Sequence, residues 1–172
     1  MTRWGVLLVA ACLLGAAACD DDSPTSPSAQ PLTFRATMSS ANEVPPVSNA
    51  ETGASGTATI TLTPTRDASN AVTGGTVTMS FTVQGFPAGS NITAAHIHGP
   101  NAPAGTNAGV LINAGVTPIP MPVGSASFTS AAVSVTDAAI INGIMSSPGT
   151  FYFNVHTTLN PGGAVRGQLV AQ

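Results

Sequence analysis

The segment Thr150-Phe-Tyr-Phe-Asn-Val-His-Thr157 sets the fold class of this chain, because apolar and polar side chains alternate along it. In an extended strand successive side chains point to opposite faces. The side chains that share the apolar face are Phe151, Phe153 and Val155. Those that share the other face are Tyr152, Asn154 and His156. The alternation predicts a β-strand with one face in a hydrophobic core.

Similar short runs recur from Leu32 to Gln172, separated by Gly, Pro, Asn and Ser. This spacing is typical of two packed antiparallel sheets, so we expect an all-β sandwich. The expected strands are 33–40, 56–63, 76–84, 93–98, 110–113, 125–129, 150–156 and 164–170. Residues 70–75 and 160–163 are expected to form turns, and residues 136–145 a short helix capped by Thr136. The prediction is an antiparallel β-sandwich of about eight strands.

The amino terminus has the pattern of an export signal. Arg3 precedes an apolar run over residues 4–14, and small residues follow. We therefore expect residues 1–18 to be a signal peptide. The next residues, 19–31, are acidic and then Ser/Pro-rich, which predicts a flexible tether ahead of a folded domain at residues 32–172.

Cys19 follows three alanines and precedes three aspartates, an arrangement similar to a bacterial lipoprotein signal. Such a signal leads to lipidation of the cysteine, so we expect an exported protein of the cell envelope that is anchored in a membrane through Cys19. Ala16 stands where these signals usually carry Leu, and ordinary signal cleavage is the alternative. The domain itself contains no cysteine, which excludes an internal disulfide and thiolate metal ligands.

The composition excludes nucleic acid as a partner. Only 6% of the 172 residues are charged, against about 25% in an ordinary soluble protein. The chain has four arginines and no lysine, and the arginines form no cluster. Binding to nucleic acid needs a patch of positive charge that neutralises phosphates, and this chain provides none.

The three histidines of the chain fall in two strand segments. His96 and His98 occur in Ala95-His-Ile-His-Gly-Pro100 and share one face of a strand, about 6.6 Å apart. His156 lies on the polar face of the first segment described above. If the two strands are neighbours, three imidazoles converge, and neutral imidazole is a common ligand of zinc and copper. Water, or Glu43 from its own loop, would be the fourth ligand. The alternative is a structural polar cluster braced by backbone and hydroxyl groups.

Arg166 is the only formally charged side chain after Asp137. An arginine in so uncharged a region is expected to have a carboxylate partner, and Glu43 is the first choice. The alternative is that Arg166 points into water. If the pair is buried, removing one partner costs more than the pair contributes, because the other charge is left uncompensated.

The chain resembles the CHRD (chordin-type) domain through several motifs in the expected order. They are Asn42-Glu-Val-Pro-Pro-Val47, Ala95-His-Ile-His-Gly-Pro100, Asn154-Val-His-Thr157 and Arg166-Gly-Gln-Leu169. The resemblance implies an extracytoplasmic, immunoglobulin-like β-sandwich and ties the chain to no established reaction. Family members often carry Glu two residues before the arginine, where this chain has Ala164, so any role of that glutamate cannot be transferred.

No catalytic motif stands out: there is no Gly-x-Ser-x-Gly elbow, no phosphate-binding glycine loop and no carboxylate pair at short spacing. Two hypotheses follow. The first is a membrane-anchored binding module without catalysis, whose partner is an extracellular protein or glycan. The second is a small metalloprotein that holds copper or zinc at His96, His98 and His156. In either case the loop at residues 99–109 is expected to contact the ligand, because it leaves the His-x-His strand directly.

Overall fold

The computed structural model describes Met1 and residues 29–172. The predicted signal peptide, Cys19 and most of the predicted tether lie outside the described residues. The described part holds eleven strands: β1 (Leu32–Ser39), β2 (Ser55–Arg66), β3 (Val72–Gln84), β4 (Ser90–His98), β5 (Val110–Asn113), β6 (Ile119–Met121), β7 (Ala126–Thr129), β8 (Val133–Val135), β9 (Tyr152–Thr157), β10 (Val165–Gln168) and β11 (Val170–Ala171). It also holds helix α1 (Ala138–Ser146) and two 3-10 turns, η1 (Ser40–Asn42) and η2 (Pro148–Thr150).

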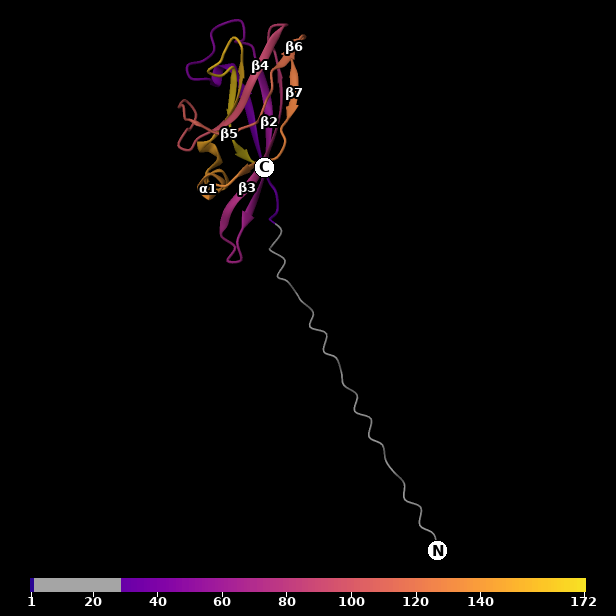
Figure 1. Cartoon of the computed structure of the whole chain (residues 1–172). Helices are drawn as coiled ribbons and strands as arrows, with labels where there is room; N and C mark the ends of the chain where they lie inside the picture. The colour runs from indigo at the N-terminus through magenta and orange to yellow at the C-terminus, as the bar shows by residue number, and fades with distance from the viewer. Residues whose placement is uncertain (2–28) are drawn as a thin grey trace.

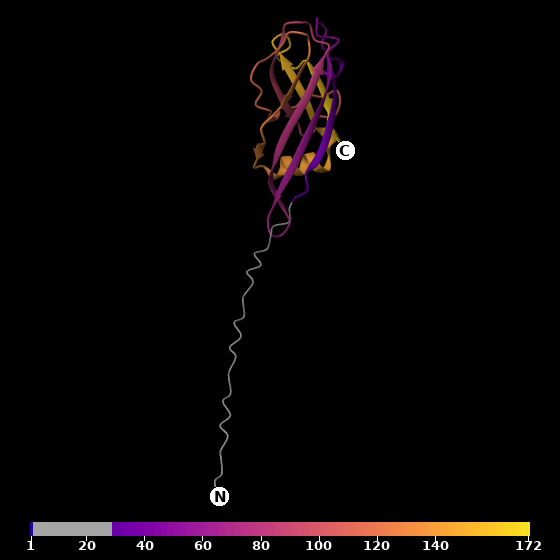
Figure 2. The same cartoon turned by 90° about the vertical axis from the view of Figure 1, so that its right-hand side faces the viewer.

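The strands form one antiparallel sheet in the order β5-β4-β9-β10-β1-β2-β3-β7, with β6 beside β4, β8 beside β3 and β11 beside β1. The sheet curls into an elongated, nearly closed sandwich (Figures 1 and 2). The all-β prediction is confirmed, but the expected count of eight was too low. Strands β6 and β8 were missed, and the predicted strand 164–170 is divided into β10 and β11; β6, β8 and β11 have only two or three residues each. Such short segments cannot show an alternating pattern.

The β2–β3 hairpin is longer than predicted. Its strands run to Arg66 and from Val72, so the turn lies at residues 67–71 and overlaps only the start of the expected residues 70–75. One carboxylate oxygen of Asp67 accepts hydrogen bonds from the backbone N–H groups of Ser69 and Ala71. This side chain closes the turn and lets the strand pairing continue beyond the glycines at 74 and 75.

Helix α1 begins one residue later than the predicted cap implied. The N-cap is Asp137, whose side chain accepts from the backbone N–H of Ala139 at 2.8 Å, and not Thr136. The helix buries Ile141 and Ile144. It lies across one end of the sandwich (Figure 2), where it covers the core between the sheet faces.

Strand β9 is buried on both faces. Its apolar side chains Phe153 and Val155 belong to the hydrophobic core. Its polar side chains lie on the opposite face of the sheet, together with those of the neighbouring strands β4 and β10. In register, Asn154 of β9 faces His96 of β4 on one side and Arg166 of β10 on the other. The fold therefore lays polar side chains across three adjacent strands, and we call this set of residues the polar layer.

Candidate functional site

The polar layer brings the three histidines together, as the sequence predicted for the case that the two strands are neighbours. One ligand atom from each of His96, His98 and His156 lies within 4.8 Å of the others. The ring centroids of His96 and His156 are 4.8 Å apart, and those of His96 and His98 are 5.7 Å apart. The β4–β9 pairing produces this convergence, because it sets two segments that are 60 residues apart in sequence side by side.

Backbone carbonyl groups fix the orientation of two of the rings. Nδ1 of His98 lies 2.9 Å from the carbonyl oxygen of Ala108, and Nδ1 of His156 lies 2.9 Å from that of Pro161. A carbonyl only accepts, so each neutral ring carries its proton on Nδ1 and presents the lone pair of Nε2. Nε2 of His98 is buried and has no hydrogen-bond partner. Metal-binding histidines are typically held in this way, with the second ring nitrogen bonded to a carbonyl or carboxylate.

The spacing of the imidazoles also fits a metal. Nδ1 of His96 lies 3.0 Å from Nε2 of His156. Two nitrogen ligands at about 2.0 to 2.1 Å from one tetrahedral zinc ion are separated by roughly 3.3 to 3.4 Å, only a few tenths of an ångström more. The pair can therefore coordinate one ion with little movement, and His98 lies close enough to join them.

The pKa values of all three imidazoles are lowered, which favours the neutral form. Burial, together with the neighbouring His156 and His98, lowers the pKa of His96 to about 4. Burial also lowers the pKa values of His98 and His156, although carbonyl hydrogen bonds partly oppose the shift. Neutral imidazole is the form that binds metal, so the site needs little proton release before an ion enters.

A stack of three planar groups continues the polar layer. The ring of His98 lies parallel to that of Tyr152, with centroids 4.6 Å apart and an angle of 5°. The guanidinium of Arg166 covers the Tyr152 ring at 4.5 Å from its centroid. Arg166 is only 1% exposed, and it donates to the carbonyl oxygen of Asn42 at 2.6 Å and to the side-chain oxygen of Asn107 at 2.9 Å. Loops from both sides thus cover the layer.

Glu43 lies near Arg166 but makes a different kind of contact from the predicted ion pair. Burial raises the pKa of Glu43 to about 7, and the charge of Arg166 partly opposes that rise. One carboxylate oxygen of Glu43 and Nη2 of Arg166 are each buried without a hydrogen-bond partner. The two groups therefore interact through space, and an energetic coupling between them stays a prediction.

Gly163 provides the space for the Glu43 carboxyl. A Cβ at this position would lie 2.7 Å from both carboxylate oxygens, and the backbone φ of +138° disfavours any other residue. The β9–β10 turn and the loop after β1 therefore meet without an intervening side chain. Asn49 and Asn160 also hydrogen-bond across this junction at 2.8 Å.

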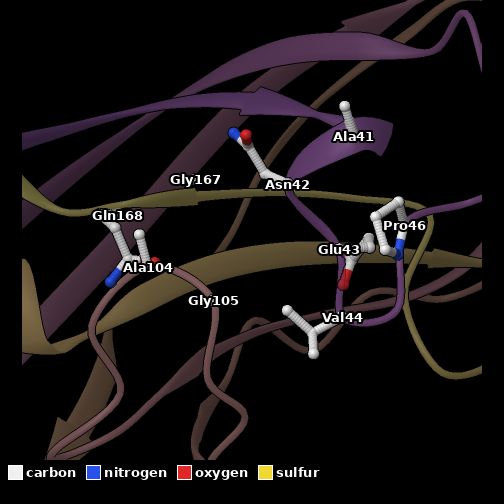
Figure 3. Close-up of a pocket in the computed structure, with 9 residues that line it drawn as sticks. All are labelled: Ala41, Asn42, Glu43, Val44, Pro46, Ala104, Gly105, Gly167 and Gln168. Atoms are coloured by element: carbon white, nitrogen blue, oxygen red, sulfur yellow. The ribbon is translucent and has the colours of Figure 1, made fainter.

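Two clefts open on either side of Glu43. The first, of about 410 Å³, lies between the segment Ala41–Pro46 and the loop that carries Ala104 and Gly105 (Figure 3). The second, of about 290 Å³, lies between Glu43–Asn49 and the turn at Leu159–Gly163. Part of the predicted ligand-contacting loop 99–109 thus lines the first cleft. Val44 and Pro46 line both clefts and Pro45 lines the second, and we call these three residues the Val44–Pro46 ridge.

Several residues of the site were not predicted from the sequence. Asn154 places its side-chain oxygen 3.0 Å from Nε2 of His156. Its position on the polar face of β9 was visible from the alternation, so the signal was present. Glu51 is fully buried and accepts from Thr157 and from Asn160, at 2.7 and 2.6 Å. No local pattern marks Glu51, because its partners are more than 100 residues away.

The family model for the CHRD domain matches residues 34–169, which include the polar layer and its covering loops. The chain belongs to the CHRD domain family. No curated protein and no solved structure was found to match this CHRD domain protein. Among the described residues, no helix of this CHRD domain protein has the length and apolar character needed to cross a membrane.

Proposed function

We propose that this protein is an exported CHRD-type binding module, held at the cell envelope by a lipid on Cys19, whose partner is an extracellular protein or glycan. Membership of the CHRD domain family supports a binding role. The pattern around Cys19 supports the anchor. The observation that carries the proposal is the pair of clefts that meet at Glu43. Loops on a rigid sheet are the usual site of recognition in β-sandwiches.

The Val44–Pro46 ridge is the part of this surface best placed to contact a partner. Pro45 and Pro46 are exposed and Val44 is half-buried, so they offer apolar contacts beside the polar atoms of Glu43 and Asn42. Both prolines have a fixed φ, and a contact surface that is already rigid loses little entropy on binding.

The test uses the full chain with a photo-crosslinking amino acid at position 46 or, as control, at the exposed Val123. Cells and a defined glycan array serve as the two partner sources. We expect discrete crosslinks from position 46 and not from position 123. Crosslinking and glycan binding are expected to be lost in Val44→Arg and kept in Val123→Arg. Equal labelling from both positions, or binding that neither variant changes, would contradict the proposal.

The anchor has a separate test. In a bacterial host, the parent chain is expected in the membrane fraction and a Cys19→Ala variant in the soluble extracytoplasmic fraction, because removal of the thiol removes the lipid. Incorporation of labelled fatty acid checks the same point. A Cys19→Ala chain that stays in the membrane fraction would argue against lipid anchoring at this residue.

A second candidate function is that of a small metalloprotein that holds copper or zinc. The specific observation that favours it is the three-histidine cluster, with ligand atoms within 4.8 Å and two rings locked with Nε2 available. The two candidate functions are compatible, because the histidines lie within the polar layer and the clefts lie at the loops that cover it. Metal titration distinguishes this candidate from histidines that only brace the fold.

A further inference from the structure

Both ring nitrogens of His156 face groups that accept hydrogen bonds. Nδ1 faces the carbonyl oxygen of Pro161 at 2.9 Å, and Nε2 faces the side-chain oxygen of Asn154 at 3.0 Å. A neutral imidazole has only one N–H, and the contact with Pro161 requires it on Nδ1. The lone pair of Nε2 then points at an oxygen lone pair, and also at Nδ1 of His96, 3.0 Å away.

Two acceptors in contact repel each other unless something lies between them. A cation bound by both atoms removes the conflict directly. Without a cation, Nε2 can accept a hydrogen bond from Nδ1 of His96 or from the nitrogen of a turned Asn154 amide, since His tautomers and the two ends of an Asn side chain are assigned from their hydrogen bonds. Asn154 is only 2% exposed, so water is not freely available to solve the problem.

We propose that the side-chain oxygen of Asn154 is the fourth ligand of a mononuclear metal site completed by His96, His98 and His156. This inference rests on the metal-binding candidate above. The separation between this oxygen and Nε2 of His156 equals that between the His96 and His156 nitrogens, at 3.0 Å. Both separations lie a few tenths of an ångström below the edge of a tetrahedral coordination sphere with bonds of about 2.0 to 2.2 Å, so a small outward shift admits the ion.

The sheet holds Asn154 at the centre of the cluster. It is the register partner of His96 on β4 and of Arg166 on β10, so backbone pairing fixes it from both sides. His98 contributes the remaining lone pair, since its Nε2 is buried and has no partner. Three imidazoles and one amide oxygen favour Zn²⁺ or Cu²⁺ over Mg²⁺ or Ca²⁺, which prefer sites made of oxygen.

A neutral ligand set leaves the charge of the ion uncompensated. Arg166 lies close by with its own positive charge, and its guanidinium stacks on the same Tyr152 ring that stacks on His98. Replacing the amide of Asn154 by a carboxylate of the same shape adds the missing negative charge at the ligand position. Asn154→Asp is therefore expected to bind the ion more tightly, and Asn154→Ala more weakly.

The experiment titrates Zn²⁺ and Cu²⁺ alone into the full chain by calorimetry and by competition with a chelator. We expect Asn154→Asp to lower the dissociation constant at least tenfold and Asn154→Ala to raise it at least tenfold. The matched control is Asn113→Asp, which adds the same charge opposite His96 on β5, at an exposed side chain that bonds the N–H of Gly115. It is expected to change the dissociation constant less than threefold.

The outcomes separate the inference from the function on which it rests. If the parent binds no ion, the metalloprotein candidate fails. If the parent binds one ion and neither Asn154 variant changes the affinity, only the role of Asn154 is overturned. If a variant does not fold, an NMR measurement on the parent still tests the inference. Zn²⁺ is expected to shift the ¹³C resonance of the Asn154 side-chain carbonyl more than that of any other asparagine. An unshifted resonance in the zinc-bound parent would overturn the inference.

Discussion

The fold buries the side-chain carboxyl of Glu43, one oxygen of which has no hydrogen-bond partner, and raises its pKa to about 7. Titration of this group therefore reports on the burial provided by the loop that covers the polar layer. The pKa is raised above the ordinary value of 4.5, so the folded chain holds the proton more tightly than the unfolded chain. The stabilising contribution of protonated Glu43 is complete below pH 4.5 and is lost as the pH rises through about 7.

Glu43→Gln is therefore expected to be more stable than the parent at pH 8, by about 2 kcal/mol, and equal to it near pH 4.5. The histidines change stability in the opposite direction, because their lowered pKa values cost stability as the pH falls. The histidines are present in both proteins, so their contributions cancel in the difference between the two free energies of unfolding. Urea unfolding of the two chains across this pH range measures the effect, and a pH-independent difference would contradict it.

Arg166 and Glu43 are expected to be energetically coupled although they share no hydrogen bond. The variants Glu43→Gln and Arg166→Met, alone and together, complete a double-mutant cycle at pH 8. Arg166→Met loses bonds to Asn42 and Asn107 and should cost about 3 kcal/mol. We expect a coupling of about 1 kcal/mol between the two sites. Losses that simply add would show that the pair contributes nothing.

The alternation placed the three histidines on polar faces, because a period of two assigns side chains to a face without any knowledge of the loops. Their convergence also needed the β4–β9 pairing, which no sequence pattern indicated. The alternation also assigned Arg166 to the polar face. The actual partners of Arg166 could not be predicted. Asn42 and Asn107 come from irregular segments 124 and 59 residues away in sequence, and no periodicity determines where such loops fold.

Strand β10 is the element that joins the two halves of the sheet, since it lies between β9 and β1. Gly167 lets the two backbones approach. A Cβ at this position would overlap the backbone carbonyl of Thr37 on β1, and backbone cannot move aside as a flexible side chain can. The glycine of the Arg166-Gly-Gln-Leu169 motif is therefore needed for sheet closure.

Gly167→Ala is expected to destabilise the protein by 2 kcal/mol or more, on the order found for steric overpacking. The matched control is Gly162→Ala in the β9–β10 turn, where no atom lies within 4 Å of the added Cβ. It should change stability by less than about 0.5 kcal/mol. Thermal unfolding compares the two, and equal midpoints would refute the role given to Gly167.

Strands with clear alternation were predicted within a few residues, and β5 was predicted with its observed bounds at 110–113. Strand β2 was predicted to end at Thr63 but continues through Pro64 to Arg66, where Pro64 is buried in step with the alternation. The missed strands are too short to carry a pattern, and tertiary pairing alone creates them. The pattern of elements thus predicted the fold class better than the number of its strands.

The folded domain has few charged residues, and an unusually large share of them is buried. The seven charged residues of the folded domain are Arg35, Glu43, Glu51, Arg66, Asp67, Asp137 and Arg166. Three of them are buried, namely Glu43, Glu51 and Arg166, and all three belong to the polar layer or to the loops that cover it. Charged residues are almost never fully buried unless they are paired. Burying these charged groups under two loops costs stability at one place in the domain. Such departures from ordinary packing are expected at functional sites.

Metal titration of the purified full chain is the first measurement to make, because it tests whether the three histidines of the polar layer form a metal site. Elemental analysis and calorimetry with Zn²⁺ and Cu²⁺ are made on the parent and on variants with His96, His98 or His156 changed to Ala. We expect the parent to bind one equivalent and each variant to lose it. A parent that binds no metal, or variants that bind as tightly as the parent, would contradict this expectation and leave the histidines as braces of the fold.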